Sequence, residues 1–351
     1  MKTKLINTVF GAIAAALLFG IMYNPTISQA SNHIRPTGKT TQQSSQLVLW
    51  YDEDEIDEDN DSFIQVTNAS VDTPVWVHVQ IFASTCLNFK DNACAPADLV
   101  LCSETNFNDF FTPNDTHVYV MENVKTNDPF LVSPLVVGNF DGTKGFVVVT
   151  PIDGPGTRKA ISHQHMFGTS FVFNDDEELG FGVSSMGRDA VSFPSGVVED
   201  DGTILDGVTN GYVLIQPKLL MFTFDHQDEL DTADLISIAF RDNYEGVFGY
   251  VAEPADATWT PLIFDDEENP ISCGAVEQDC FFNIGLNSLL DPINDLLNPV
   301  DDFSICPNNN INRGFMKIAV GGLEGLENEM AIVLQADLSD EEGVASWMYG
   351  D

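Results

Sequence analysis

The densest concentration of side chains that could bind a metal lies near the start of the chain. Eight of the ten residues from Asp52 to Asp61 carry a carboxylate. Within this run, Asp57 and Asp59 stand with Asp61 at the spacing of the first three ligands of a calcium-binding EF-hand loop. Serine and asparagine replace the turn glycine and the final bidentate glutamate of that loop. Two interpretations therefore stay open for this run: a solvated acidic segment, or a weaker calcium site that other loops complete.

His163 and His165 form the only close pair among the six histidines. On a β-strand, alternate residues share a face, so the two imidazoles could chelate a transition metal. Their sequence, HQHMFG, resembles the HxHxFG stretch of copper-zinc superoxide dismutases, but that fold needs further histidines downstream and only His226 follows. The alternative is a pair of exposed polar side chains beside Arg158 and Lys159.

Catalytic signatures are absent from the sequence. It contains no G-x-S-x-G elbow, no H-E-x-x-H, no Walker loop and no C-x-x-C-H haem attachment. This absence favours a protein that is not an enzyme, although it leaves the question open. Two of the 54 acidic residues could have the spacing of a glycosidase pair, and Trp50, Trp76 and Trp259 could form a sugar-stacking platform. A carbohydrate-binding or carbohydrate-cleaving protein with a glycan partner is therefore the alternative function.

The six cysteines predict disulfides and fall into two groups of three. The members are Cys86, Cys94 and Cys102 in the front group, and Cys273, Cys280 and Cys306 in the back group. Because three is odd, complete pairing within one molecule needs at least one bond between the groups. The two groups would then be neighbours in space. One free or intermolecular thiol in each group is the alternative.

The N-terminus has the composition of a secretory signal peptide. Lys2 and Lys4 precede an apolar run from Leu5 to Met22, and small residues follow up to Ala30. We expect a signal peptide over residues 1–30, with an uncleaved membrane anchor as the alternative. No later segment is long and apolar enough to span a bilayer. The protein is therefore expected to be secreted, extracellular or periplasmic.

The charge of the chain is strongly negative, at a formal −40 from 54 acidic and 14 basic residues. Such a field repels nucleic acid and anionic membrane surfaces, which excludes nucleic acid as a partner. It is compatible with divalent cations, with cationic partners or with a salty environment that screens the self-repulsion. Salt adaptation and ion binding both remain open explanations.

Short β-strands are expected to position the acidic, histidine and cysteine residues described above. From Leu47 onward, apolar runs rich in Val, Ile, Phe and Thr recur between turn residues, and Val75–Phe82 alternates strictly. There is no βαβ rhythm, so the pattern predicts an all-β fold, an antiparallel β-sandwich. The hairpin sequence VTNASVDTPVWVHV resembles the first hairpin of secreted immunoglobulin-like sandwiches. That resemblance implies only a fold, either an immunoglobulin-like sandwich or a larger double sandwich.

Three segments depart from the strand pattern. Leucines at helical spacing predict one short helical segment near residues 284–297. Residues 31–45 are polar and aperiodic, which predicts a flexible linker before a body that spans residues 46–351. The sequence PIDGPG, residues 151–156, is the best candidate for a boundary between two lobes of that body.

The export signal, the strands and the acidic loops together predict a secreted acidic β-sandwich protein with a structural or adhesive role. Its place would be the cell surface or the extracellular matrix. The expected ion is calcium, and the expected partner is a second copy or a cell-surface protein.

Overall fold

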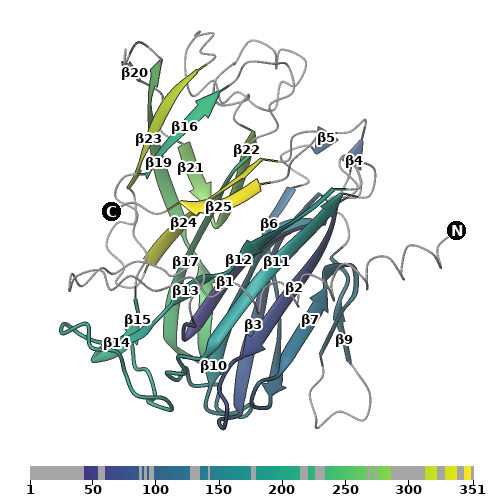
Figure 1. Ribbon diagram of the computed structural model, residues 1–351, viewed down its shortest axis with the longest axis vertical. Coiled ribbons are helices and arrows are strands. Elements are labelled where there is room, and N and C mark those ends of the chain that lie inside the picture. Colours follow the sequence, from purple (N-terminus) through teal and green to yellow (C-terminus); the bar gives the residue numbers. More distant parts are fainter. Residues whose placement is uncertain are drawn as a thin grey trace, which may run out of the picture. The chain divides into compact units, whose positions relative to one another are not determined.

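The structure is a computed structural model of an all-β chain (Figure 1). It describes residues 43–53, 60–86, 89–90, 93–94, 99–126, 135–140, 143–174, 179–213, 220–225, 234–265, 267, 270–272, 276–285, 313–321, 329–337 and 344–348. All of them belong to one compact unit, Pro36–Asp351, and the signal peptide predicted over residues 1–30 lies outside them. Among the described residues, no helix is long and apolar enough to cross a membrane.

Four larger antiparallel sheets contain most of the strands. The central sheet has the order β13 (Met186–Arg188), β1 (Gln46–Glu53), β10 (Thr143–Ile152), β3 (Val75–Cys86) and β6 (Leu99–Phe111). The outer sheet has the order β12 (Leu179–Ser184), β11 (Met166–Asn174), β2 (Asn60–Asn68) and β7 (Thr116–Val120). The third sheet has the order β18 (Gly249–Pro254), β17 (Asp234–Gly246), β24 (Glu329–Asp337) and β25 (Val344–Met348), with β22 (Phe281–Gly285) also on β17. The fourth has the order β16 (Leu220–Asp225), β23 (Arg313–Gly321), β19 (Asp256–Asp265) and β20 (Pro270–Ser272), with β21 (Val276–Asp279) also on β19.

The remaining described elements are short. Three strand pairs are β4 (Phe89–Lys90) with β5 (Ala93–Cys94), β8 (Val124–Thr126) with β9 (Leu135–Gly138), and β14 (Ala190–Ser192) with β15 (Asn210–Tyr212). A single 3-10 turn, η1 (Met121–Asn123), is the only helical element in the described part of the chain. Ile284 and Gly285 end strand β22, so a helix cannot begin at residue 284 as the leucine spacing predicted. The rest of that predicted segment lies outside the described residues.

The central sheet is covered on both faces, as strand β1 shows. Its residues Leu47 and Leu49 share a core with Ile64 of the outer sheet. The alternate residues, Val48 and Trp50, belong to a second core that includes Ile238 and Phe240 of the third sheet. Every residue of β1 is buried for this reason. Burying each large apolar side chain contributes about 1.5 to 3 kcal/mol, so these two cores are the main source of stability in the described body.

Strand β3 confirms the core face predicted from its alternation and adds a second one. The predicted face, Val75 to Ile81 in steps of two, is fully buried. On the opposite face, His78 and Gln80 are also buried, and the third sheet covers Gln80. The Gln80 amide pairs with the backbone of Ala252 in β18, donating to its carbonyl at 3.0 Å and accepting its N–H at 2.7 Å. This side chain therefore supplies hydrogen bonds between two sheets that share no strand.

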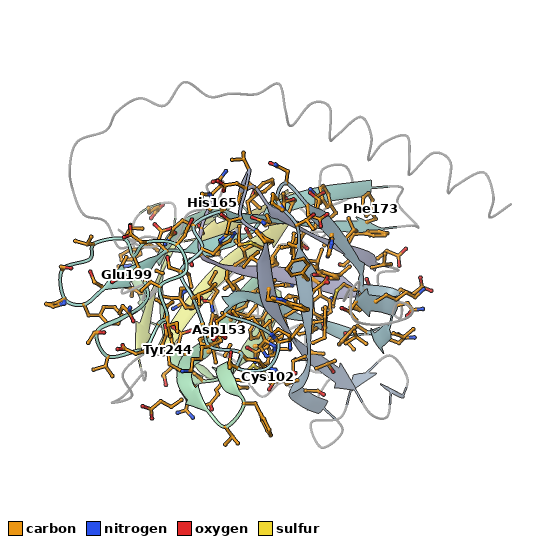
Figure 2. The ribbon with its side chains drawn as sticks, turned by 90° about the horizontal axis from the view of Figure 1, so that it is seen from below. Cys102, Asp153, His165, Phe173, Glu199 and Tyr244 are labelled. Carbon is orange, nitrogen blue, oxygen red and sulfur yellow. A yellow bond between two sulfur atoms is a disulfide. The ribbon has the colours of Figure 1, made fainter. Side chains whose placement is uncertain are left out.

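The disulfide between Cys102 and Cys280 connects strand β6 of the central sheet with the residue that precedes β22 (Figure 2). It joins the front and back cysteine groups, which confirms that a bond between the two groups exists. Cys86 ends β3 and Cys94 lies in β5. Their partners stay a prediction, and Cys273 and Cys306 lie outside the described residues.

The segments predicted as linker and hinge belong partly to the packed body. The sequence places Ser44 and Ser45 at the end of the flexible linker, but both are buried, and Ser44 pairs with Met166 through backbone hydrogen bonds.

At the expected lobe boundary, residues 151–152 still belong to β10, and residues 153–157 form a turn. Residues from both sides of that turn share the core between the central and third sheets.

A buried ion pair also joins the central sheet to the third sheet. Arg188 at the end of β13 makes a bidentate contact with Asp242 of β17, with N–O distances of 3.0 and 2.6 Å. The Tyr250 hydroxyl donates to the same carboxylate at 2.6 Å, and Gln46 accepts a further hydrogen bond from the guanidinium. Burial, together with the negative charge of Asp242, raises the pKa of Tyr250 well above its usual range, so this hydroxyl remains a donor. The pair links the central and third sheets through fully hydrogen-bonded charges.

Candidate functional site

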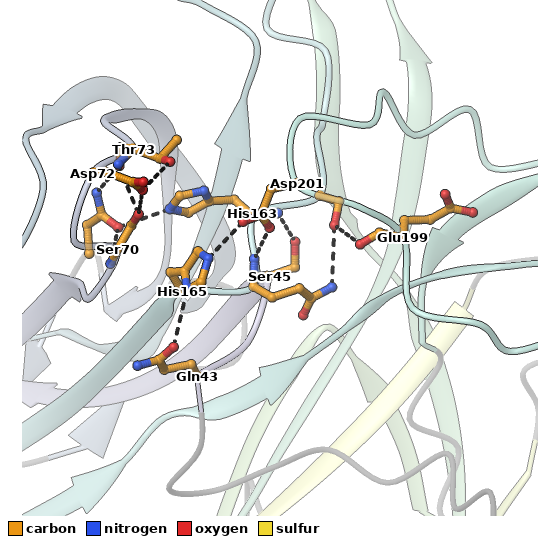
Figure 3. Close-up of polar contacts among 12 residues, drawn as sticks. Gln43, Ser45, Ser70, Asp72, Thr73, His163, His165, Glu199 and Asp201 are labelled. Atoms are coloured by element: carbon orange, nitrogen blue, oxygen red, sulfur yellow. Dashed lines mark hydrogen bonds and ion pairs between the residues drawn. The ribbon is translucent and has the colours of Figure 1, made fainter.

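The histidine pair lies in the connection between the central and outer sheets, which Figure 3 shows in detail. The expectation that His163 and His165 lie on one strand is wrong. Residues 162–165 form a turn, in which the His165 N–H donates to the His163 carbonyl at 2.8 Å. The chain must turn here because β10 ends in one sheet and β11 begins in another. The two rings meet edge to face with their centroids 5.2 Å apart.

The His163 side chain is buried and tied to strand β2. Its Nε2 lies 3.0 Å from Oδ1 of Asn68, and its backbone N–H donates to the Ser45 hydroxyl at 2.8 Å. Burial lowers the pKa of His163 to about 4, although the negative charge of Asp201 partly opposes this effect. The imidazole is therefore neutral at physiological pH and acts as a structural hydrogen-bonding group.

The His165 side chain is partly exposed and faces an acidic loop. Its Nε2 lies 2.7 Å from Oδ2 of Asp201, and its Nδ1 lies 3.2 Å from Oε1 of Gln43. The other oxygen of Asp201 accepts the backbone N–H of Gln164 at 2.9 Å. These hydrogen bonds occupy both ring nitrogens of His165. Within the described ranges, no group of three or more His, Cys, Asp or Glu side chains could hold a metal ion. A transition metal on this pair stays a prediction that the described contacts do not support.

We expect His163 to make the protein less stable in acid. The folded-state pKa of about 4 lies below the unfolded value of about 6.5. The stabilising effect is therefore complete above pH 6.5 and is lost as the pH falls toward 4. At 1.36 kcal/mol per pKa unit, about 2 to 3 kcal/mol of this effect is lost by pH 4.5. Urea unfolding at pH 7.5 and pH 4.5 measures it. The His163→Gln variant should show a smaller difference between the two pH values, and an unchanged difference would contradict this origin.

A second histidine site, which the sequence did not suggest, joins an end strand of the central sheet, β6, to an end strand of the outer sheet, β7. The buried Asp109 of β6 accepts from His117 of β7, whose Nδ1 is 2.7 Å away, and from the Tyr119 hydroxyl at 2.9 Å. Asp115 lies 3.4 Å from the other ring nitrogen of His117. Burial disfavours the charged imidazole, but the hydrogen bond to Asp109 and the two carboxylate charges outweigh it and raise the pKa of His117. His117 and Tyr119 occupy alternate positions of one strand, so a search for inward-facing polar residues two apart could have found them.

His117 should have the opposite pH dependence to His163. Because the folded-state pKa of His117 is raised, its stabilising effect is complete below the unfolded value of about 6.5 and is lost as the pH rises through the folded value. Titration by two-dimensional NMR of the imidazole protons should give a midpoint above 6.5. The His117→Gln variant should lose stability at pH 6 and lose less at pH 9. Equal losses at both pH values would show that the charge of His117 is not involved.

The acidic run begins with buried carboxylates at the end of strand β1. Glu53 accepts the Ser62 N–H at 2.6 Å, and Asp52 lies 3.2 Å from Nζ of Lys144. Of the three predicted calcium ligands, Asp61 lies at the start of β2 and is partly buried, while Asp57 and Asp59 lie outside the described residues.

A second acidic sequence adjoins the same end of the outer sheet. Asn60 of β2 pairs with Asn174 of β11. Asn60 directly follows the segment 54–59, in which five of six residues are acidic, and Asn174 directly precedes the acidic residues 175–178. The two acidic sequences are therefore attached to neighbouring strand ends.

The tryptophans do not share one exposed platform. Trp50 is buried in the core between the central and third sheets. Trp76 packs against Phe110 with ring centroids 5.1 Å apart. The side chain of Trp259 lies outside the described part of the structure. Trp50 therefore cannot contribute to a sugar-stacking surface.

The structure also exposes apolar side chains that the sequence reading did not single out. We define the apolar loop surface as Phe193, Val197, Val198, Val208, Val247 and Phe248. Val247 and Phe248, at the tip of the β17–β18 hairpin, are 93% and 77% exposed, and Val208 is 76% exposed. The other three belong to the same excursion around β14 and β15 and are at least 36% exposed. The turn sequences GVVEDD and EGVFGY could have indicated this exposure, because they place valine and phenylalanine among glycine and acidic residues, which are typical of surface turns.

No protein-family model, curated protein or solved structure matches this chain.

Proposed function

We propose that this protein is a secreted, acidic β-sandwich protein with a structural or adhesive role at the cell surface or in the extracellular matrix. The apolar loop surface is the observation that carries the proposal. Single exposed apolar residues are ordinary, but a contiguous group of them marks an interaction surface, and the packing of Tyr244 against Gly207 and Gly211 brings the two loops that carry these residues together. Covering Phe248 with a partner would contribute about 1.5 to 3 kcal/mol to binding. Export is supported by the disulfide, since such bonds persist in oxidising compartments.

The architecture supports this role because the loops project from a body of buried strands. Strands β1 and β10 are buried along nearly their whole length, and the Cys102–Cys280 bond joins the central sheet to the chain leading into β22. Binding residues are commonly loop residues on such scaffolds. We propose a double sandwich rather than a single immunoglobulin-like one, because the central sheet is covered on both faces.

Adhesion to whole cells of the producing organism tests the proposal directly. The mature chain, residues 31–351, should bind to the cells. A Val247→Ser/Phe248→Ser double variant should bind at least tenfold more weakly, because a tenfold loss corresponds to only about 1.4 kcal/mol. Val71→Ser is the matched control, since Val71 is 79% exposed in a different loop. Absence of binding, or equal losses for both variants, would contradict the proposal.

We also propose that calcium stabilises the acidic end of the outer sheet. The proposal rests on the ligand spacing of Asp57, Asp59 and Asp61 and on the attachment of two acidic sequences to the paired residues Asn60 and Asn174. Adjacent carboxylates repel one another, and a divalent cation relieves this repulsion. Differential scanning calorimetry at low salt should give a melting temperature several degrees higher with calcium than with chelator. Magnesium is the control, and an unchanged melting temperature would contradict calcium binding.

A further inference from the structure

We infer that the apolar loop surface binds a cationic protein partner that presents an apolar pocket bordered by lysine or arginine. The inference rests on the proposed adhesive role and names the chemistry of its partner. It is based on three features of the described residues, which are the exposed apolar side chains, the acidic residues among them and the packing that holds the loops together.

The loops that carry the apolar side chains are acidic and contain no basic residue. Residues 189–213 hold five carboxylates and no lysine, arginine or histidine. Asp200 and Asp206 are exposed there, and Glu245 is exposed two residues before Val247. Carboxylates therefore accompany the apolar side chains in both loops, and Arg158, whose carbonyl accepts the Tyr250 N–H, is a basic residue beside the hairpin. A partner that covers the valines and Phe248 would also have to compensate these carboxylates, which a basic border does.

Asp206 shows that this charge is permanent. Its Oδ1 accepts the backbone N–H groups of Val208 and Thr209, both at 2.7 Å, and its Oδ2 accepts the Thr209 hydroxyl at 2.7 Å. Hydrogen bonds from the Thr209 side chain and from the backbone lower the pKa of Asp206 to about 2. A charged carboxylate is thus held two residues from the exposed Val208 at every physiological pH.

The loops are held together by an aromatic contact beneath the surface. A Cβ atom at Gly207 would lie 2.5 Å from the Tyr244 ring, and one at Gly211 would lie 2.9 Å from the Tyr244 hydroxyl and 3.0 Å from the Phe193 ring. Only glycine leaves room for these rings. The Tyr244 hydroxyl also accepts the backbone N–H of Tyr212 at 2.8 Å. In Figure 2, Tyr244 and Glu199 mark this part of the ribbon.

The hairpin tip is anchored as well. Gly249 has a φ of +103° and packs so closely on the turn at residues 157–158 that a Cβ there would lie 2.4 Å from the Thr157 carbonyl oxygen. The next residue, Tyr250, donates its N–H to the Arg158 carbonyl at 2.8 Å. The backbone that follows the tip is therefore held in place, which limits the conformations open to Val247 and Phe248. A preformed surface loses less conformational entropy on binding, which favours recognition.

The negative charge of the chain distinguishes between the possible binding partners of the apolar loop surface. A second copy would bring another acidic surface, and the net charge of −40 opposes that contact. An anionic membrane and nucleic acid are disfavoured for the same reason. A cationic protein surface is the occupant that gains from both the apolar side chains and the carboxylates.

Peptide binding to the mature chain tests the inference. The probe is a fluorescent octapeptide of alternating lysine and leucine, measured by anisotropy. Two control peptides replace either every lysine or every leucine by serine. The alternating peptide should bind at least tenfold more tightly than each control. Its affinity should fall at least tenfold with Val247→Ser/Phe248→Ser, and severalfold with Asp200→Asn/Glu245→Gln, which should also weaken its salt dependence.

The matched control protein is Val71→Ser/Glu122→Gln, which removes one exposed valine and one exposed carboxylate elsewhere. It should bind the peptide within twofold of the wild type. An equal loss in this control would mean general attraction to an acidic protein and would overturn the inference. Equally tight binding of the serine–leucine peptide would overturn the cationic partner. If cells still adhere through Val247 and Phe248 in either case, the proposed function stands without this partner. Circular dichroism and urea unfolding should show all variants folded, since the replaced side chains are exposed.

Discussion

Replacing Arg188 by methionine should lower the free energy of unfolding by about 3 to 5 kcal/mol. The guanidinium is fully buried and lies 2.6 Å from Oδ2 of Asp242, whose side chain is also buried. Methionine fills much of the same volume but leaves the Asp242 carboxylate without a positive charge. The Tyr250 hydroxyl still donates to that carboxylate, but one neutral donor does not replace two charged ones. Equilibrium unfolding in urea measures the loss.

The neighbouring sequence offers a matched control for this prediction. Arg241 pairs with Glu253 at 2.7 Å, but both side chains are about one-third exposed. Arg241→Met should therefore lower the stability by less than about 1 kcal/mol. The double variant Arg188→Met/Asp242→Leu should recover much of the loss, because it removes both buried charges. Similar losses for Arg188→Met and Arg241→Met would show that burial of the ion pair is not what makes it important.

Removal of the Cys102–Cys280 disulfide should have the second large effect. The bond closes a loop of 178 residues, so it restricts the unfolded chain strongly. For a loop of this length, chain entropy predicts a stabilisation of about 5 kcal/mol, and measured values are commonly 2 to 4 kcal/mol. We expect the Cys102→Ala/Cys280→Ala variant to lose stability in this range while keeping its β-sheet circular dichroism.

Peptide mapping provides the check on this bond. Under non-reducing conditions, mass spectrometry should find the peptide that contains Cys102 linked to the peptide that contains Cys280. Reduction of the wild type should lower its urea midpoint at least as far as the double alanine substitution does. A mapped bond from Cys102 to a different cysteine, or an unchanged urea midpoint in the variant, would contradict the assigned pairing.

Local patterns in the sequence predicted the strands because strand geometry repeats every two residues. The alternation from Val75 to Ile81 identified a core face that is buried as expected. Because each group holds an odd number of cysteines, complete pairing within one molecule needed a bond between the groups, and Cys102–Cys280 is such a bond. Both inferences depend only on spacing and counting, which the sequence contains in full.

The histidines show where local patterns fail. The spacing of His163 and His165 was compatible with a strand, but a turn is needed to pass from the central sheet to the outer sheet. The partners of these side chains, Asn68 and Asp201, are 95 and 36 residues away in the chain. No spacing rule connects residues that far apart. His117 is only 8 residues from its partner Asp109, but the two lie on strands of different sheets, so their contact also depends on the tertiary structure.

Composition and periodicity were sufficient for the all-β class and the antiparallel strands, and the cysteine count predicted a bond between front and back groups on the condition that all six cysteines pair within one molecule. Only the tertiary structure determined which strands adjoin the acidic run and whether the histidine side chains are buried. It attaches two acidic sequences to the paired residues Asn60 and Asn174, and it buries His163 as a neutral hydrogen-bonding group. It also leaves Val247 and Phe248 exposed on a loop. The physical reason is that burial, and with it pKa and binding capacity, depends on which distant segment covers a side chain, and a single sequence does not state that pairing.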